Sequence, residues 1–110
     1  METLLEAIKQ LEEKQIKAKA NRKSLDYSTR NQANSEVYYN RCNLFAMYTA
    51  WYIVKHNVDL ENHINDVMSE YKGDQGWNGY GDSYMITAFS NQVKKLVENE
   101  KALCVDRQDA

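Results

Sequence analysis

The sequence predicts an all-α fold, and three observations support this interpretation. Neither glycine nor proline interrupts residues 1–72, apolar residues recur at helical spacing, and no segment shows the alternating pattern of a half-buried strand. Four amphipathic helices are expected, forming a small four-helix bundle with long first and second helices and a glycine-rich loop before the last helix. The 110 residues, 43% of them hydrophobic, suit one domain over residues 1–110, with a frayed C-terminal tail from about residue 105.

The first helix is expected over residues 2–24, because Leu4, Ile8 and Leu11 fall on one face. Its apolar stripe thins in the second half, where basic residues accumulate. The polar segment 24–35, SLDYSTRNQANS, is rich in side chains that compete for backbone hydrogen bonds. We therefore expect this segment to form the first connection.

The second helix, over residues 36–56, is apolar around much of its circumference and should be the most buried element. Asn57 is expected to end it, and Asp59 to cap a third helix over residues 60–72. The third helix has a single apolar face, made of Leu60, Ile64, Val67, Met68 and Tyr71. A fourth helix, capped by Asp82 or Ser83, should extend to about Leu103.

The segment 72–84, KGDQGWNGYGDSY, contains all four glycines of the chain. Its glycine spacing does not match a phosphate-binding loop, and an acidic residue at the following helix start would repel phosphate. Tryptophan and tyrosine are enriched among binding hot spots, which makes this loop a candidate recognition surface. The predicted protein-binding residues are Asp74, Trp77, Asn78, Tyr80 and Asp82. The alternative, in which Trp77 folds back and closes one end of the bundle, stays open.

A second candidate surface is basic. Residues 14–30 contain six basic residues and one acidic residue. Clustered cations on a helix can follow a phosphate backbone, so nucleic-acid binding is the alternative function. The residues concerned are Lys14, Lys17, Lys19, Arg22, Lys23 and Arg30. Because the whole chain has a formal net charge of -2, a solvated helical face explains the same pattern.

The segment 57–83 is acidic, with six carboxylates and one lysine. Together with the basic first helix it gives the molecule a charge dipole, which suits oriented docking to another protein or to a second copy of this chain. A homodimer that pairs through the first helix is one form of such docking, and the sequence leaves it open.

No catalytic or metal centre is predicted. Cys42 and Cys104 lack the close spacing of a metal or redox motif. The histidines lack the spacing of a helical metal motif, and Cys42 and His56, fourteen residues apart on one helix, would be separated by about 21 Å. We therefore expect no cofactor, no metal and no enzyme activity, with an enzyme of unrecognised site as the third hypothesis.

The opening residues lack the pattern of a secretory signal, and the most apolar segment, residues 42–54, is shorter than the roughly 20 residues that cross a bilayer. A cytoplasmic protein without membrane contact is expected. The absence of proline and the eleven asparagines are typical of AT-rich coding in phage and mobile elements, in which case the location is the host cytoplasm. The leading hypothesis is a small non-catalytic protein-binding module that acts as an inhibitor, adaptor or regulatory protein.

Overall fold

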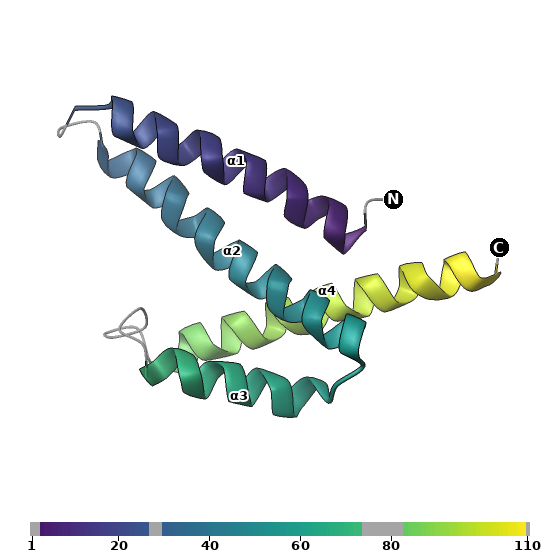
Figure 1. Cartoon of the computed structure of the whole chain (residues 1–110). Coiled ribbons are helices and arrows are strands. Elements are labelled where there is room, and N and C mark those ends of the chain that lie inside the picture. Colours follow the sequence, from purple (N-terminus) through teal and green to yellow (C-terminus); the bar gives the residue numbers. More distant parts are fainter. Residues whose placement is uncertain (1–2, 27–29, 74–82, 110) are drawn as a thin grey trace. The chain divides into compact units, whose positions relative to one another are not determined.

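The computed structural model describes residues 3–26, 30–73 and 83–109, with side chains for 3–26, 30–70 and 87–103. This part of the chain is all-helical and contains no strand, which confirms the predicted fold class (Figure 1). The helices are α1 (Leu4–Ser24), α2 (Arg30–His56), α3 (Leu60–Gly73) and α4 (Ser83–Asp109). None of these described helices is both long enough and apolar enough to cross a membrane.

The contacts divide the chain into two compact units, residues 1–48 and residues 49–110. The division falls inside α2, so this helix supplies its first part to one unit and its last two turns to the other. The first unit contains α1 and the first part of α2, and the second contains the end of α2 with α3 and α4.

In the first unit, α1 begins with a capping box. The Thr3 hydroxyl accepts a hydrogen bond from the backbone N–H of Glu6 at 3.2 Å, and the Glu6 carboxylate accepts one from the backbone N–H of Thr3 at 3.4 Å. These two bonds satisfy amides that a helix start otherwise leaves unpaired. The start of α1 is thereby defined within two residues of the predicted position.

The α1–α2 pair forms a helical hairpin (Figure 1). Its buried apolar side chains are Leu4, Ile8, Ala18, Ala33, Val37, Leu44, Ala46 and Met47. The predicted connection over residues 24–35 is wrong in part, because α2 already begins at Arg30. The extra turns, residues 30–35, bury Ala33, and this burial outweighs the small helix-propensity cost of the Asn and Ser residues around it.

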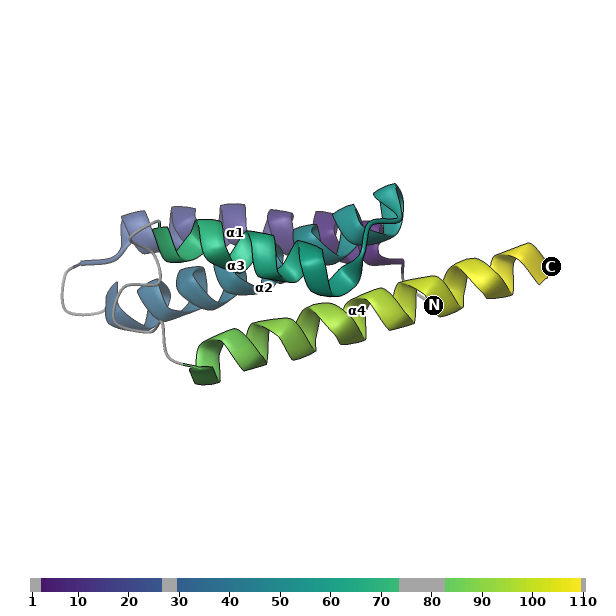
Figure 2. The same cartoon turned by 90° about the horizontal axis from the view of Figure 1, so that it is seen from below.

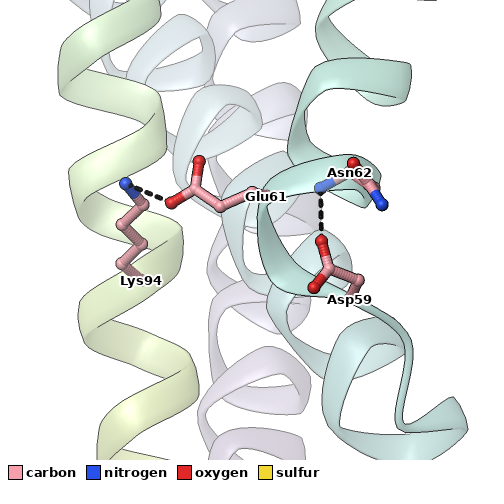
Figure 3. A network of polar contacts seen from close by, with 4 residues as sticks. All are labelled: Asp59, Glu61, Asn62 and Lys94. Atoms are coloured by element: carbon pink, nitrogen blue, oxygen red, sulfur yellow. Dashed lines mark hydrogen bonds and ion pairs between the residues drawn. The ribbon is translucent and has the colours of Figure 1, made fainter.

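The turn between α2 and α3 in the second unit follows the prediction. Asn57 adopts φ 52°, the left-handed conformation that ends many helices, and the backbone N–H of Val58 donates to the carbonyl of Ile53 at 3.4 Å. The Asp59 carboxylate then accepts a hydrogen bond from the backbone N–H of Asn62 at 3.0 Å (Figure 3). Both residues therefore have the capping roles that the sequence predicts.

The helices α3 and α4 run in opposite directions (Figure 2). Lys94 of α4 forms an ion pair with Glu61 of α3 at 2.8 Å, as Figure 3 shows. The core of the second unit is built from Ala50, Ile53, Ile64, Met68, Phe89, Val93 and Val97. Helix α4 extends six residues beyond its predicted end, because neither proline nor glycine interrupts the chain after residue 83.

Candidate functional site

The predicted recognition loop lies outside the described residues. Asp74, Trp77, Asn78, Tyr80 and Asp82 all belong to residues 74–82. Their assignment as protein-binding residues stays a prediction from the sequence.

The six basic residues of the alternative site do not share one face of the hairpin. Lys14, Lys17, Lys19 and Lys23 are exposed on α1, whereas Arg22 and Arg30 are half-buried. At 3.6 residues per turn, Lys17 and Lys23 point about 120° apart around α1. The exposed lysines are therefore distributed around the helix rather than aligned along a track.

Three of the six cations do come together where α1 ends and α2 begins. Arg22, Lys23, Arg30 and Asn34 line a hollow of about 530 Å³, which we call the cationic pocket. Two helix termini position these residues, since Arg22 and Lys23 lie in the last turn of α1 and Arg30 is the first residue of α2. No carboxylate is among the described residues that line it.

Arg30 has a defined orientation in the cationic pocket. Its Nη2 donates a hydrogen bond to the backbone carbonyl of Leu25 at 3.0 Å. Its Nε is buried and has no hydrogen-bond partner among the described residues. An unpaired buried donor costs about 1–3 kcal/mol, and more when the group is charged.

A second hollow, of about 360 Å³, lies at the same end of the hairpin. It is lined by Asn21, Leu25, Gln32, Ala33 and Glu36. Its described lining contains one acidic residue and no basic residue, so it differs from the cationic pocket in charge. The other nearby acidic residue in the sequence is the exposed Asp26.

A larger candidate surface runs along the hairpin, and we call it the hairpin flank. On α1 its members recur at intervals of four, three, four and three residues: Leu5, Lys9, Glu12, Ile16 and Lys19. On α2 they recur at three, four and three: Tyr38, Arg41, Phe45 and Tyr48. These spacings place each set in one stripe along its helix. Every member is exposed except Phe45, which is half-buried, and Ile16 is 69% exposed.

A hydrogen bond joins the two stripes. The Tyr48 hydroxyl of α2 donates to a carboxylate oxygen of Glu12 of α1 at 2.7 Å. This bond raises the pKa of Tyr48 above its ordinary value, and partial burial and the negative charge of Glu12 act in the same direction. The bond places both stripes on the same side of the hairpin.

A buried polar network fixes the register of α1 against α2. Gln15 is 7% exposed; its amide nitrogen donates to the carbonyl of Val37 at 3.0 Å, and its amide oxygen accepts from the Asn40 side chain at 3.1 Å. A glutamine buried in this way must keep its partners, because burial without them is costly. The network therefore holds the two stripes in one relative position.

The second unit contains an aromatic cluster. Tyr52 of α2 stacks on His63 of α3, with ring centroids 4.7 Å apart and planes 14° apart, and its ring lies 4.3 Å from that of His56. Lys55 lies over the Trp51 ring at 4.4 Å, a cation–π geometry. Among the described residues, no group of three or more His, Cys, Asp or Glu side chains is arranged to hold a metal ion. These contacts explain the positions of Trp51 and Tyr52 as packing between neighbouring turns and helices.

Sequence reasoning missed Gln15, Ile16 and the Tyr48–Glu12 bond. The thinning of the apolar stripe on the first helix was visible, but it does not show that a glutamine replaces an apolar residue in the core while Ile16 faces solvent. The signal available was the spacing of three between Gln15 and Ala18, which continues the stripe of Leu4, Ile8 and Leu11.

Comparison with known proteins identifies no relative: no family model, no curated protein and no solved structure matches this chain.

Proposed function

We propose that this chain is a small protein-binding module whose hairpin flank docks on an acidic, amphipathic surface of another protein. The observation that carries the proposal is the pair of exposed stripes in which Ile16, Tyr38 and Tyr48 stand among cations. Large apolar side chains grouped on a surface and surrounded by polar residues are typical of interaction sites.

The residue types of the hairpin flank fit a binding surface. Tyrosine and arginine are enriched among hot spots, and the flank contains Tyr38, Tyr48 and Arg41 on one stripe. Spacings of three and four residues are also those with which one helix presents anchors to a partner. The flank can thus contribute both apolar contact area and charge-assisted hydrogen bonds.

The charge of the flank indicates the kind of partner. The flank contains three cations, Lys9, Lys19 and Arg41, and one carboxylate, that of Glu12, which already accepts the Tyr48 hydrogen bond. A basic rim around apolar anchors favours a partner with acidic residues around an apolar strip, and it accelerates encounter with such a partner.

Preorganisation supports the same proposal. The Gln15 network and the Tyr48–Glu12 bond hold both stripes in place before any partner arrives. A surface that is already ordered loses less entropy on binding than a flexible one.

The proposal also includes the helical bundle and the loop surface that the sequence predicts. The four helices would complete a small bundle, and the loop residues Asp74, Trp77, Asn78, Tyr80 and Asp82 would form a second contact surface of an inhibitor, adaptor or regulatory protein in the cytoplasm. No step of this function requires catalysis, a metal or a cofactor. Nucleic-acid binding is less favoured, because the six basic residues do not align on one face of the hairpin.

The test is affinity capture from nuclease-treated lysate of the source cells with three folded variants beside the wild type. Ile16→Ala with Tyr48→Ala changes the flank, Gln10→Ala with Lys14→Ala changes exposed side chains of α1 outside the flank, and Trp77→Ala with Tyr80→Ala changes the loop. An acidic protein that is captured by the wild type and by the Gln10/Lys14 variant, and lost with the Ile16/Tyr48 variant, is the expected result. Loss with the loop variant alone would assign binding to the loop and reject the flank.

A further inference from the structure

We propose that the cationic pocket binds a phosphoryl group, either as inorganic phosphate or as a phosphate monoester. This inference does not depend on the hairpin flank, because the pocket lies at the end of the hairpin and its lining residues are separate from the flank residues. It concerns a small-ligand site, whereas the proposed function concerns a protein surface.

The lining has the chemistry that a phosphoryl group requires. Arg22, Lys23 and Arg30 supply three positive charges, and the Asn34 amide supplies a neutral donor. Arginine pairs with phosphate oxygens through two parallel N–H groups, and lysine contributes a point charge. These donors come from the end of one helix and the start of another, so they surround a ligand from two sides.

Arg30 supplies the independent observation. One edge of its guanidinium is held by the carbonyl of Leu25, and the buried Nε has no partner among the described residues. The guanidinium is therefore oriented by the protein before a ligand binds. A phosphoryl oxygen in the pocket is an acceptor of the right charge for a guanidinium held in this way.

The size and shape of the site favour a compact ligand over a nucleic-acid strand. A hollow of about 530 Å³ lies within the usual range of small-molecule sites. A strand needs cations along its length, but Lys14, Lys17 and Lys19 lie outside the pocket lining and are distributed around α1. The second hollow at this end of the hairpin has an acidic residue in its lining, so it offers no comparable anion site.

The experiment is a calorimetric titration of the full chain at low ionic strength, where screening is weak. Inorganic phosphate and glycerol phosphate are the two probes, and a single-stranded oligonucleotide is the comparison. Arg30→Gln removes the oriented guanidinium, and Asn34→Asp places a carboxylate in the lining at an exposed position that leaves the core unchanged. Lys14→Gln is the matched control, since it removes one exposed charge of the same hairpin outside the pocket.

We expect saturable binding of phosphate to the wild type, with affinity reduced roughly tenfold or more by Arg30→Gln and by Asn34→Asp, because each change weakens charge-assisted hydrogen bonds. Lys14→Gln should bind within about twofold of the wild type, since a screened charge outside the pocket contributes little. Tighter binding of glycerol phosphate than of phosphate would identify a monoester as the ligand, and the reverse would identify the free ion. Circular dichroism of each variant shows that it is folded.

Three results would overturn the inference. The first is the absence of saturable phosphate binding by the wild type. The second is an equal loss of affinity in Lys14→Gln and Arg30→Gln. The third is preferential binding of the oligonucleotide with equal dependence on Lys14 and Arg30, which would replace the pocket by an extended basic surface.

Discussion

Tyr48 of α2 donates a hydrogen bond to Glu12 of α1 across the hairpin, with 2.7 Å between the hydroxyl and the carboxylate oxygen. A tyrosine that donates a hydrogen bond to a carboxylate loses this bond when its hydroxyl ionises. The negative phenolate would then be repelled by the negative carboxylate. For this reason the bond raises the pKa of Tyr48, and partial burial adds to the effect. The pKa of this one residue therefore reports whether the two stripes of the hairpin flank are joined.

The first prediction concerns that pKa. Glu12→Gln should lower the pKa of Tyr48 toward its ordinary value of 10.0, because it removes the charged acceptor. An NMR pH titration of labelled tyrosine rings measures it, with Tyr48→Phe to assign the resonance. The control is Glu13→Gln, which changes an exposed carboxylate with no described contact to Tyr48. An unchanged pKa in Glu12→Gln would mean that the bond does not exist in solution.

The second prediction is the dependence of stability on pH. The pKa of Tyr48 is raised in the folded state, so folding favours the neutral phenol. The resulting stabilisation is complete below the pKa of the unfolded state, about 10, and it is lost as the pH rises through the pKa of the folded state. Wild type should therefore lose more unfolding free energy than Tyr48→Phe above about pH 10. The difference should be small, since the side chain is 43% exposed and water screens the interaction. Urea denaturation at several pH values measures it, and parallel pH profiles would contradict the prediction.

The third prediction concerns the buried network. Gln15→Ala removes both hydrogen bonds of the buried amide and leaves a cavity, so the unfolding free energy should fall by about 1–3 kcal/mol. Gln10→Ala, at an exposed position of the same helix, should change it by less than about 0.5 kcal/mol. Urea denaturation compares the two variants. Equal effects would show that Gln15 does not fix the α1–α2 register.

The fourth prediction concerns the core of the second unit. Ile53 is 1% exposed, so Ile53→Ala should reduce the unfolding free energy by roughly 2–5 kcal/mol through lost burial and the cavity that remains. Asn65→Ala, at an exposed position of α3, is the control and should have little effect. Thermal denaturation, monitored by circular dichroism, measures the difference in stability between the two variants. A cost below about 1 kcal/mol for Ile53→Ala would show that this position is not tightly packed.

The parts of the fold that the sequence predicts well are those governed by local chemistry. The single apolar face of α3 and the capping roles of Asn57 and Asp59 depend on residues within a few positions of each other. The predicted start of α2 is six residues too late because Asn and Ser favour turns locally, whereas the helix includes them and buries Ala33. Packing against a distant segment decided that boundary, and a sequence pattern does not contain this information.

The same distinction applies to the candidate sites. The number of basic residues in segment 14–30 is visible in the sequence, but their separation into a pocket and scattered lysines depends on how α1 pairs with α2. The hairpin flank also depends on this pairing, because the Tyr48–Glu12 bond shows that the two stripes lie on one side of the hairpin. The loop residues 74–82 remain a prediction from residue types alone.

The most direct test of protein binding through the flank is site-specific photo-cross-linking in lysate of the source cells. A photoreactive residue replaces either Ile16 or Lys14, two exposed positions of α1 that point about 160° apart. Cross-linking of one acidic protein from position 16, with none from position 14, is the expected result. Equal cross-linking from both positions, or cross-linking from position 14 alone, would contradict docking through the hairpin flank.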